Sequence, residues 1–192
     1  MSELTDHDRR ALLVLARSTI ESNLIKDRRV IRPANMTPAL TEKRGCFVTL
    51  HKRGNLRGCI GTIEPKTSLV ASVEENAVNA AFSDPRFPPL AEDELPDIEI
   101  EISVLTVPKT LEYSSPEELK QKLKPHIHGV ILSRGWQRST FLPQVWKQLP
   151  ETEDFLKNLC QKAGMERNCW KDKNTMVKVY EAEYFSEGDY LQ

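Results

Sequence analysis

Residues 46–63, CFVTLHKRGNLRGCIGTI, decide the fold that this sequence predicts. Cys46–His51 is rich in β-forming side chains and is typical of a strand, and Leu56–Ile63 is typical of a second one. The polar residues Lys52–Asn55 between them favour a tight turn. The stretch therefore predicts an antiparallel hairpin, and the other elements of the chain are expected to surround it.

Helices and further strands flank this hairpin in the sequence. Apolar side chains recur at helical spacing over residues 5–26, 67–82 and 153–163, and a shorter helix begins at Ser115-Pro116. Strand patterns cover residues 97–105, 128–133, 139–142 and 176–185, whereas residues 30–42 and the proline-rich Asp84–Leu90 favour loops. Strands and helices do not alternate regularly, so the sequence predicts an α+β fold with a mainly antiparallel sheet and flanking helices.

Length and composition limit the class of protein. A chain of 192 residues, 39% of them hydrophobic and 29% charged, predicts one globular domain or two joined subdomains. No stretch reaches the roughly 18–20 uncharged apolar residues of a membrane helix, and the acidic start is unlike a signal peptide. We expect a cytoplasmic protein with four free thiols, at Cys46, Cys59, Cys160 and Cys169. No two of them have the CxxC spacing of a zinc or redox site.

Charged residues are unevenly distributed, although the net charge is only -1. Residues 1–66 carry 13 basic and 7 acidic side chains, whereas residues 67–118 carry 2 and 12. The basic segment suggests a surface for an anionic ligand or a nucleic acid. The alternative is that the two oppositely charged segments pair with each other. A pI near 6.5 argues against a dedicated nucleic-acid-binding protein.

The most unusual motif is Arg57-Gly58-Cys59-Ile60-Gly61, in the second strand of the hairpin. Glycine within a strand marks a bulge or a close approach to the backbone. In a functional interpretation, Arg57 and the amides of Gly58 and Gly61 bind an anionic or carbonyl oxygen. The cation also lowers the pKa of the Cys59 thiol, which makes it a nucleophile. The structural alternative makes Cys59 a small hydrophobic residue in a tightly packed strand.

Two histidines and two carboxylates are further candidates. His126 and His128 would share one face of an extended segment, which suits a metal site or a general base. Glu99 and Glu101 share a strand face, where neighbouring carboxylates divide acid and base roles or supply a third metal ligand. Two histidines alone do not form a metal site, and their simpler interpretation is two polar residues that enter a strand. The simpler interpretation of the two carboxylates is a strand face that points to water or to the basic N-terminal segment. The cofactor is unknown from the sequence.

Four segments of the chain together resemble a known family. They are LRGCIG at residues 56–61, AFSDPRFPPL at 81–90, HGV at 128–130 and TFLPQVW at 140–146. In this order they resemble the AMMECR-type domain family over nearly the whole chain. The resemblance implies an α+β fold of two unequal subdomains, with the cysteine motif near a groove between them. It also implies cytosolic archaeal and bacterial members, sometimes associated with a Memo-like domain and a radical S-adenosylmethionine protein. It carries over the cysteine motif as a signature, but no reaction.

These patterns lead to three hypotheses of function. The leading one is a cysteine-dependent enzyme, or an accessory subunit of one, that acts on a small molecule in a cleft around the cysteine motif. Cys59 is then the nucleophile or contact thiol, His128 the base, and Glu99 or Glu101 the carboxylate that orients it. The first alternative is a protein-interaction module in which Asp84–Leu90 forms part of a docking groove. The second is a nucleic-acid-binding domain that uses the basic first third of the chain.

Overall fold

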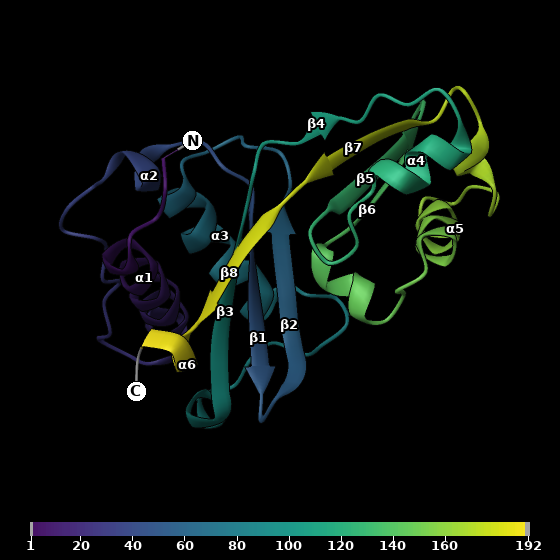
Figure 1. The fold of residues 1–192 in the computed structure, drawn as a ribbon. Coiled ribbons are helices and arrows are strands. Elements are labelled where there is room, and N and C mark those ends of the chain that lie inside the picture. The colour runs from purple at the N-terminus through teal and green to yellow at the C-terminus, as the bar shows by residue number, and fades with distance from the viewer. Residues whose placement is uncertain (1, 191–192) are drawn as a thin grey trace. The chain divides into compact units, whose positions relative to one another are not determined.

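The computed structural model describes residues 2–190, which form two compact units (Figure 1). The first unit combines residues 2–107 with residues 183–190, and the second spans residues 108–182. Each unit has a four-stranded antiparallel sheet and its own hydrophobic core. The predicted α+β class is confirmed.

The first unit is built from two long helices and one sheet. Its helices are α1 (Asp6–Leu24), α2 (Pro38–Thr41), α3 (Leu69–Phe82) and α6 (Glu187–Tyr190), with a 3-10 helix, η1 (Glu92–Asp97). Its strands are β1 (Cys46–Lys52), β2 (Asn55–Thr62), β3 (Ile98–Leu105) and β8 (Ala182–Ser186), in the order β2-β1-β3-β8. The predicted hairpin is β1 with β2, and the first two predicted helices are α1 and α3.

Local sequence explains where these helices begin and end. Thr5 and Asp8 form a capping box at the start of α1, in which each side chain accepts a hydrogen bond from the other residue's backbone N–H. The Ser68 hydroxyl caps α3. That helix ends at Phe82, close before Asp84-Pro85, because the residue before a proline disfavours helical geometry.

Apolar and polar side chains alternate along the strands of the first sheet, so the sheet has one apolar and one polar face. Val48 and Leu50 of β1, with Ile100 and Ile102 of β3, are fully buried in a core that α1 and α3 complete. Each such side chain contributes about 1.5–3 kcal/mol when fully buried. The opposite face carries the polar side chains of the same strands, and the candidate site lies there.

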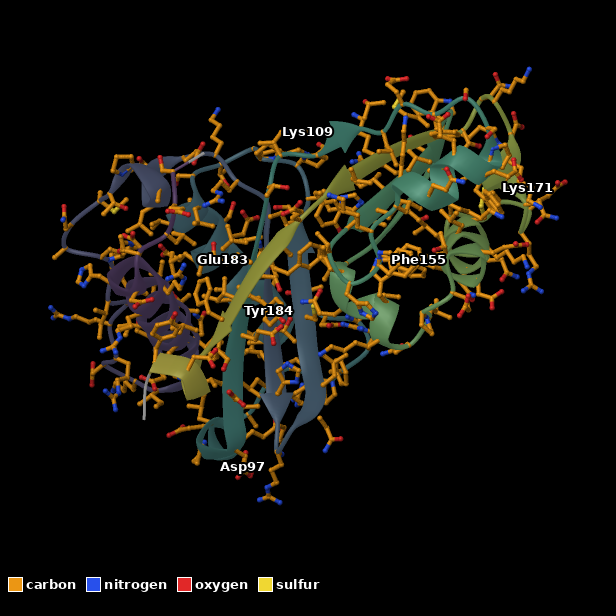
Figure 2. All side chains as sticks on the ribbon, viewed as in Figure 1. Asp97, Lys109, Phe155, Lys171, Glu183 and Tyr184 are labelled. Carbon is orange, nitrogen blue, oxygen red and sulfur yellow. A yellow bond between two sulfur atoms is a disulfide. The ribbon has the colours of Figure 1, made fainter. Side chains whose placement is uncertain are left out.

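The second unit packs shorter elements around an aromatic core. Its strands are β4 (Lys109–Thr110), β5 (Gly129–Arg134), β6 (Gln137–Phe141) and β7 (Met176–Tyr180), in the order β4-β7-β5-β6. Its helices are α4 (Pro116–Lys122), η2 (Pro143–Lys147), α5 (Thr152–Lys162) and η3 (Cys169–Lys171). The rings of Trp146 and Phe155, the latter labelled in Figure 2, stack with their centroids 3.7 Å apart.

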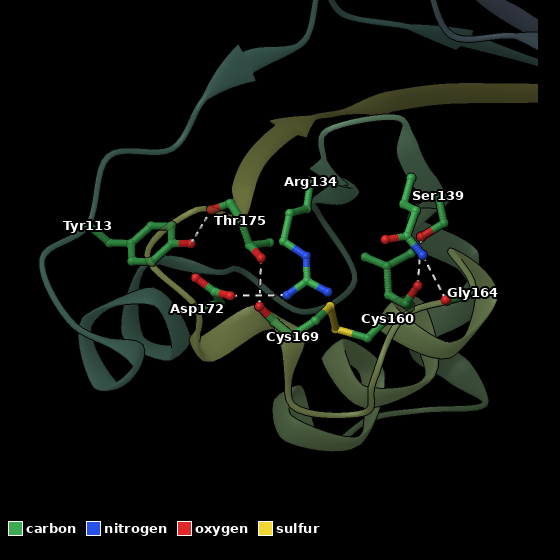
Figure 3. The surroundings of a disulfide bond; sticks show 10 residues. Tyr113, Arg134, Ser139, Cys160, Gly164, Cys169, Asp172 and Thr175 are labelled. Carbon is green, nitrogen blue, oxygen red and sulfur yellow. Dashed lines mark hydrogen bonds and ion pairs between the residues drawn. A yellow bond between two sulfur atoms is a disulfide. The ribbon is translucent and has the colours of Figure 1, made fainter.

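A disulfide joins Cys160 near the end of α5 to Cys169 in η3 (Figure 3). The expectation of four free thiols is therefore wrong for this pair, whereas Cys46 and Cys59 are free. Gly164, with φ of 70°, ends α5 at the predicted position and reverses the chain. This reversal brings Cys160, on the apolar face of the helix, next to Cys169. The sequence pattern assigns the first to the core and the second to a polar loop.

The single strand predicted over residues 176–185 is instead two strands. β7 ends at Tyr180 in the second sheet, and β8 begins at Ala182 in the first. Glu181 lies where the chain leaves one sheet for the other. The prediction failed here because no glycine or proline marks the break, so the strand pattern continues through it.

The helices of both units are short or amphipathic. The longest, α1, has 19 residues and contains several charged side chains. Among residues 2–190, none is both long and apolar enough to cross a lipid bilayer.

Candidate functional site

A row of polar side chains crosses the polar face of the first sheet. Cys59 of β2 lies opposite Thr49 of β1, which in turn lies opposite Glu101 of β3. Directly paired residues point to the same face, and the Thr49 hydroxyl donates a hydrogen bond to the Cys59 sulfur over 3.3 Å. The Cys59 side chain is partly exposed, so it combines a fixed position with access to solvent.

The loop after α3 holds the backbone of Cys59 from the outer edge of β2. The Asp84 carboxylate accepts the Cys59 backbone N–H at 2.8 Å, and Nη2 of Arg86 donates to the Cys59 carbonyl at 3.3 Å. The Arg86 side chain also donates two hydrogen bonds to Asp84, and these hold the pKa of that buried carboxyl well below its usual range. The two side chains thus stand where a further strand would pair, and we call this arrangement the Asp84–Arg86 clamp.

Arg57 lies in a β-bulge, where the pairing of β1 and β2 slips by one residue. Its guanidinium donates to the Glu94 carboxylate at 3.0 and 2.8 Å and to carbonyl oxygens of Pro88–Pro89. Only 8% of Arg57 is exposed. Its charge is therefore engaged in fixing the proline-rich loop, and the cation whose field acts on the Cys59 thiol is Arg86.

The two glycines of the motif permit close packing. A Cβ atom on Gly58 would lie 2.1 Å from the backbone oxygen of Ala80 in α3, and one on Gly61 would lie 2.3 Å from the Phe47 ring. Side chains cannot approach that closely, so both positions require glycine. The glycines therefore let a helix and an aromatic ring pack directly on β2 beside Cys59.

The surroundings of Cys59 disfavour the thiolate. Burial raises the pKa of the Cys59 thiol above its ordinary value of 9.0, and the Thr49 hydrogen bond and the Arg86 charge offset this only in part. Two neighbouring carboxylates raise it further. The predicted lowering of this pKa is wrong, and the thiol is protonated at pH 7. The other free cysteine, Cys46, is fully buried, and burial raises its pKa to about 12.

His128 lies in the second unit, directly before β5. Its Nδ1 accepts a hydrogen bond from the Lys124 backbone N–H at 3.2 Å, and its carbonyl accepts one from the Trp146 indole. Burial and the charge of Lys124 lower the pKa of His128, so the ring is neutral at pH 7. His126 has φ of 66° in the preceding turn. The predicted extended segment with both rings on one face is therefore wrong. In the described part of the chain, no three His, Cys, Asp or Glu side chains gather as metal ligands.

Glu99 and Glu101 share the polar face of the first sheet but have different neighbours. Glu101 lies opposite Thr49, whereas Glu99 lies opposite His51 and accepts a hydrogen bond from the Gly188 backbone N–H at 3.2 Å. Since His51 is two residues from Thr49 along β1, it points to the same face as Cys59. His51 is thus a histidine that the first unit itself places on this face.

The oppositely charged segments of the chain pair with each other. Ion pairs between the basic first segment and the acidic middle segment are Arg32–Glu74, Lys52–Glu94, Arg53–Asp97 and Arg57–Glu94. This favours the alternative interpretation of the charge distribution. The four basic side chains of these pairs are thus held by carboxylates.

Sequence reasoning missed the side chains that contact Cys59, namely Thr49, Asp84 and Arg86. Asp84 and Arg86 flank a proline in the resembling segment, and this spacing of opposite charges was the available signal. Counting pairs from the hairpin turn would place Thr49 opposite Gly58. Only the bulge at Arg57, one of the two features that the motif glycines indicate, brings Thr49 opposite Cys59.

The two sheets and the clamped cysteine define a class of two-unit α+β proteins with one fixed, partly exposed thiol. Residues 13–185 match the AMMECR1 family, and the chain belongs to this family. A protein of Methanothermobacter thermautotrophicus is 41% identical over 96% of both chains. One of Methanocaldococcus jannaschii is 38% identical, over 90% of this chain and 86% of its own. The crystal structure of an uncharacterized protein from Pyrococcus horikoshii is similar, with a TM-score of 0.83 and 38% identity, over 91% of this chain and 89% of that chain. The names of these relatives state no function.

Proposed function

We propose that this protein is an enzyme, or the accessory subunit of one, that binds a small anionic or carbonyl compound at the polar face around Cys59. Cys59 serves as the nucleophile or contact thiol, and Arg86 binds the negative charge of the ligand. The Asp84–Arg86 clamp is the observation that carries the proposal. The clamp fixes the backbone of a partly exposed residue, and a fixed position is what a reacting or ligand-contacting atom needs.

Arg86 is suited to contact a ligand because half of its side chain is exposed. The exposed fraction of the side chain is 52% for Arg86, compared with 10% for the side chain of Arg57. Arg86 donates hydrogen bonds to Asp84 and Cys59 through its backbone N–H, its Nε and its Nη2. Within residues 2–190, Nη1 of Arg86 donates no hydrogen bond. Nη1 is therefore available to an oxygen of a bound anion.

A nucleophilic role requires a base, because the Cys59 thiol is protonated at pH 7. Glu101, on the far side of Thr49, and His51 on the same face are the groups of the first unit that suit this task. The base role of His128, oriented by Glu99 or Glu101, stays a prediction. A contact role needs no base, since a neutral thiol beside Arg86 also fits a carbonyl or anionic group.

Alkylation of the native protein with iodoacetamide, read out by mass spectrometry, tests the proposal. Cys59 is the thiol expected to react, because Cys46 is buried and Cys160 is in a disulfide. The rate should rise with pH through a midpoint above 9.0. Arg86→Gln should raise the midpoint further, Arg86→Lys should largely restore it, and the exposed control Arg53→Gln should leave it unchanged. The proposal is contradicted if Cys59 of the folded protein never reacts, or if Arg86→Gln does not change the pH midpoint of its alkylation.

A protein-interaction module is the second candidate, and the rigidity of the Asp84–Leu90 loop favours it. Arg57 binds carbonyl oxygens of the loop, and the Phe87 ring lies 5.4 Å from the Arg86 guanidinium. A partner such as a Memo-like domain or a radical S-adenosylmethionine protein would then recognise the loop surface. Cys59→Ser distinguishes the two candidates: partner binding measured by calorimetry should survive it, whereas a function of the thiol should not.

A further inference from the structure

We propose that the second unit holds a separate binding site for a small molecule that carries an anionic group on a flat apolar body. A pocket of about 440 Å³ lies between residues 110–116 and residues 171–177, all within this unit. Pockets for small ligands usually measure roughly 300–1,000 Å³, so this volume suits such a compound. The pocket shares no residue with the polar face around Cys59.

The lining of the pocket combines apolar and aromatic side chains with polar ones. Leu111, Tyr113, Pro116 and Val177 contribute to the lining, and Met176, which is 49% exposed, contributes a flexible side chain. An aromatic ring, a proline and a methionine around one pocket fit a flat apolar group, since methionine adapts its shape and contacts rings favourably. The body of the ligand is therefore expected to be aromatic or similarly flat.

Two lysines and two carboxylates line the edge of the pocket, and the Lys171 ammonium lies 5.0 Å from the centroid of the Trp170 ring. Lys171, labelled in Figure 2, and Lys173 have no ion pair within residues 2–190. The carboxylate of Asp172 between them binds Arg134 at 3.0 Å. Glu112 is the remaining carboxylate of the lining, so the two lysines outnumber it. This balance favours a ligand with a carboxylate, sulfonate or phosphate group.

One wall of the pocket is already ordered (Figure 3). The Tyr113 hydroxyl donates to the Thr175 carbonyl at 3.1 Å, and the Thr175 hydroxyl donates to the Cys169 carbonyl at 2.6 Å. Cys169 is in turn bound to Cys160 of α5. Because these contacts fix the wall before a ligand arrives, binding needs little further ordering of the protein.

Fluorescence titration of the full chain with anilinonaphthalene sulfonate, an anionic flat probe, tests this site. The uncharged phenylnaphthylamine is the matched probe. We expect Lys171→Gln with Lys173→Gln to weaken binding of the sulfonate roughly tenfold, since each exposed charge pair contributes modestly. Glu112→Gln should strengthen it, because the substitution removes a repelling carboxylate. None of these variants should change binding of the uncharged probe.

The double substitution Lys26→Gln with Lys147→Gln is the control, because it removes the same charge outside the pocket. It should leave the sulfonate affinity unchanged, and near-ultraviolet circular dichroism verifies that every variant is folded. The proposal is overturned if the wild-type protein does not bind the sulfonate. It is equally overturned if the pocket variants bind like the wild type, or if the control weakens binding as much as they do.

Discussion

The two units of this protein stabilise their cores by different means, and they use their cysteines differently. The first unit buries an aliphatic core under two long helices and leaves both of its cysteines free. The second unit is smaller, packs around aromatic rings and closes a disulfide between two buried cysteines. A small unit buries less apolar surface per residue, so a covalent bond contributes most there. In the larger unit, Cys59 is not needed for a disulfide and can take part in a function.

The positions of the tryptophans allow the unfolding of the two units to be measured separately. All three tryptophans, Trp136, Trp146 and Trp170, belong to the second unit, and the last two are fully buried. Tryptophan fluorescence therefore follows unfolding of the second unit alone. Amide hydrogen exchange reports on both units, so the two measurements together assign a loss of stability to one of them.

The largest effect is expected from Arg57→Ala in the first unit. Arg57 and Glu94 are both largely buried, and removal of the cation leaves the carboxylate and the carbonyl oxygens of the Pro88–Pro89 segment short of a partner. Breaking such a buried pair costs about 3–5 kcal/mol. Urea unfolding followed by far-ultraviolet circular dichroism should show this loss, and hydrogen exchange should assign it to the first unit.

Arg53→Ala is the matched control for this substitution. Arg53 also pairs with a carboxylate of the same region, Asp97, but its side chain is 75% exposed. Because water and salt screen an exposed pair, the loss should stay below about 1 kcal/mol. Equal losses in the two variants would mean that burial of the Arg57 pair is unimportant.

The second largest effect is expected from removal of the disulfide. Cys160 and Cys169 lie nine residues apart in sequence, and closing a loop of this length stabilises a fold by about 2.6 kcal/mol. The double substitution to alanine should shift the fluorescence-detected transition to lower urea, with protection in the first unit unchanged. Reduction of the wild-type protein should reproduce the shift, and the variant should not respond to the reductant. A loss shared by both units would contradict the separate roles of their cysteines.

Acid should weaken the first unit through Glu94. Hydrogen bonds from Arg57, working against burial, lower the pKa of Glu94 from 4.5 to about 2. A carboxyl with a lowered folded-state pKa stabilises the fold above its unfolded-state value, and this contribution is lost as the pH falls toward 2. The stability difference between wild type and Glu94→Gln should therefore shrink by about 2 kcal/mol between pH 7 and pH 3.

Glu118→Gln in the second unit is the control for the pH experiment. Hydrogen bonds from Lys122 and Ser114 also lower the pKa of Glu118 to about 2, but this carboxylate lies at the surface. Solvent screens it, so its pH effect should be smaller and should vanish in high salt. If the wild-type advantage over Glu94→Gln is the same at pH 3 as at pH 7, the buried ion pair does not have the assigned role.

Much of the fold could be predicted because its signals are local. The hairpin, α1 with its Thr5 cap, and α3 with its end before Pro85 all follow from short patterns of polarity, capping and turn residues. The break at Glu181 could not be predicted, because it depends on which sheet each half of the segment joins. The disulfide was missed because the pattern assigns Cys160 to a helix core and Cys169 to a polar loop, and neither assignment shows that the reversal at Gly164 brings the two together.

The sequence singles out the motif around Cys59, but it does not show which groups contact that residue. Two glycines around Cys59 correctly indicate close approach to the backbone, yet what approaches is α3 and the Phe47 ring. Arg57 is adjacent in sequence, but the bulge directs it to Glu94, and Arg86 from a distant loop takes the place beside the thiol. The sign of a pKa shift depends on such burial and pairing, neither of which the motif contains.

The smallest effect on stability, below about 0.5 kcal/mol, is expected from Cys59→Ser. The clamp binds backbone groups of residue 59, which the substitution keeps, and a serine hydroxyl can still accept the Thr49 hydrogen bond. Alkylation should be lost in this variant while hydrogen exchange of the first unit is unchanged. Asp84→Ala is the converse variant: it keeps the thiol, removes the clamp, and should accelerate exchange of the Cys59 amide. If Cys59→Ser instead destabilises the first unit as much as Asp84→Ala does, Cys59 has a structural role. The free and the bridged cysteines would then both serve stability, and they would differ only in whether they form a disulfide.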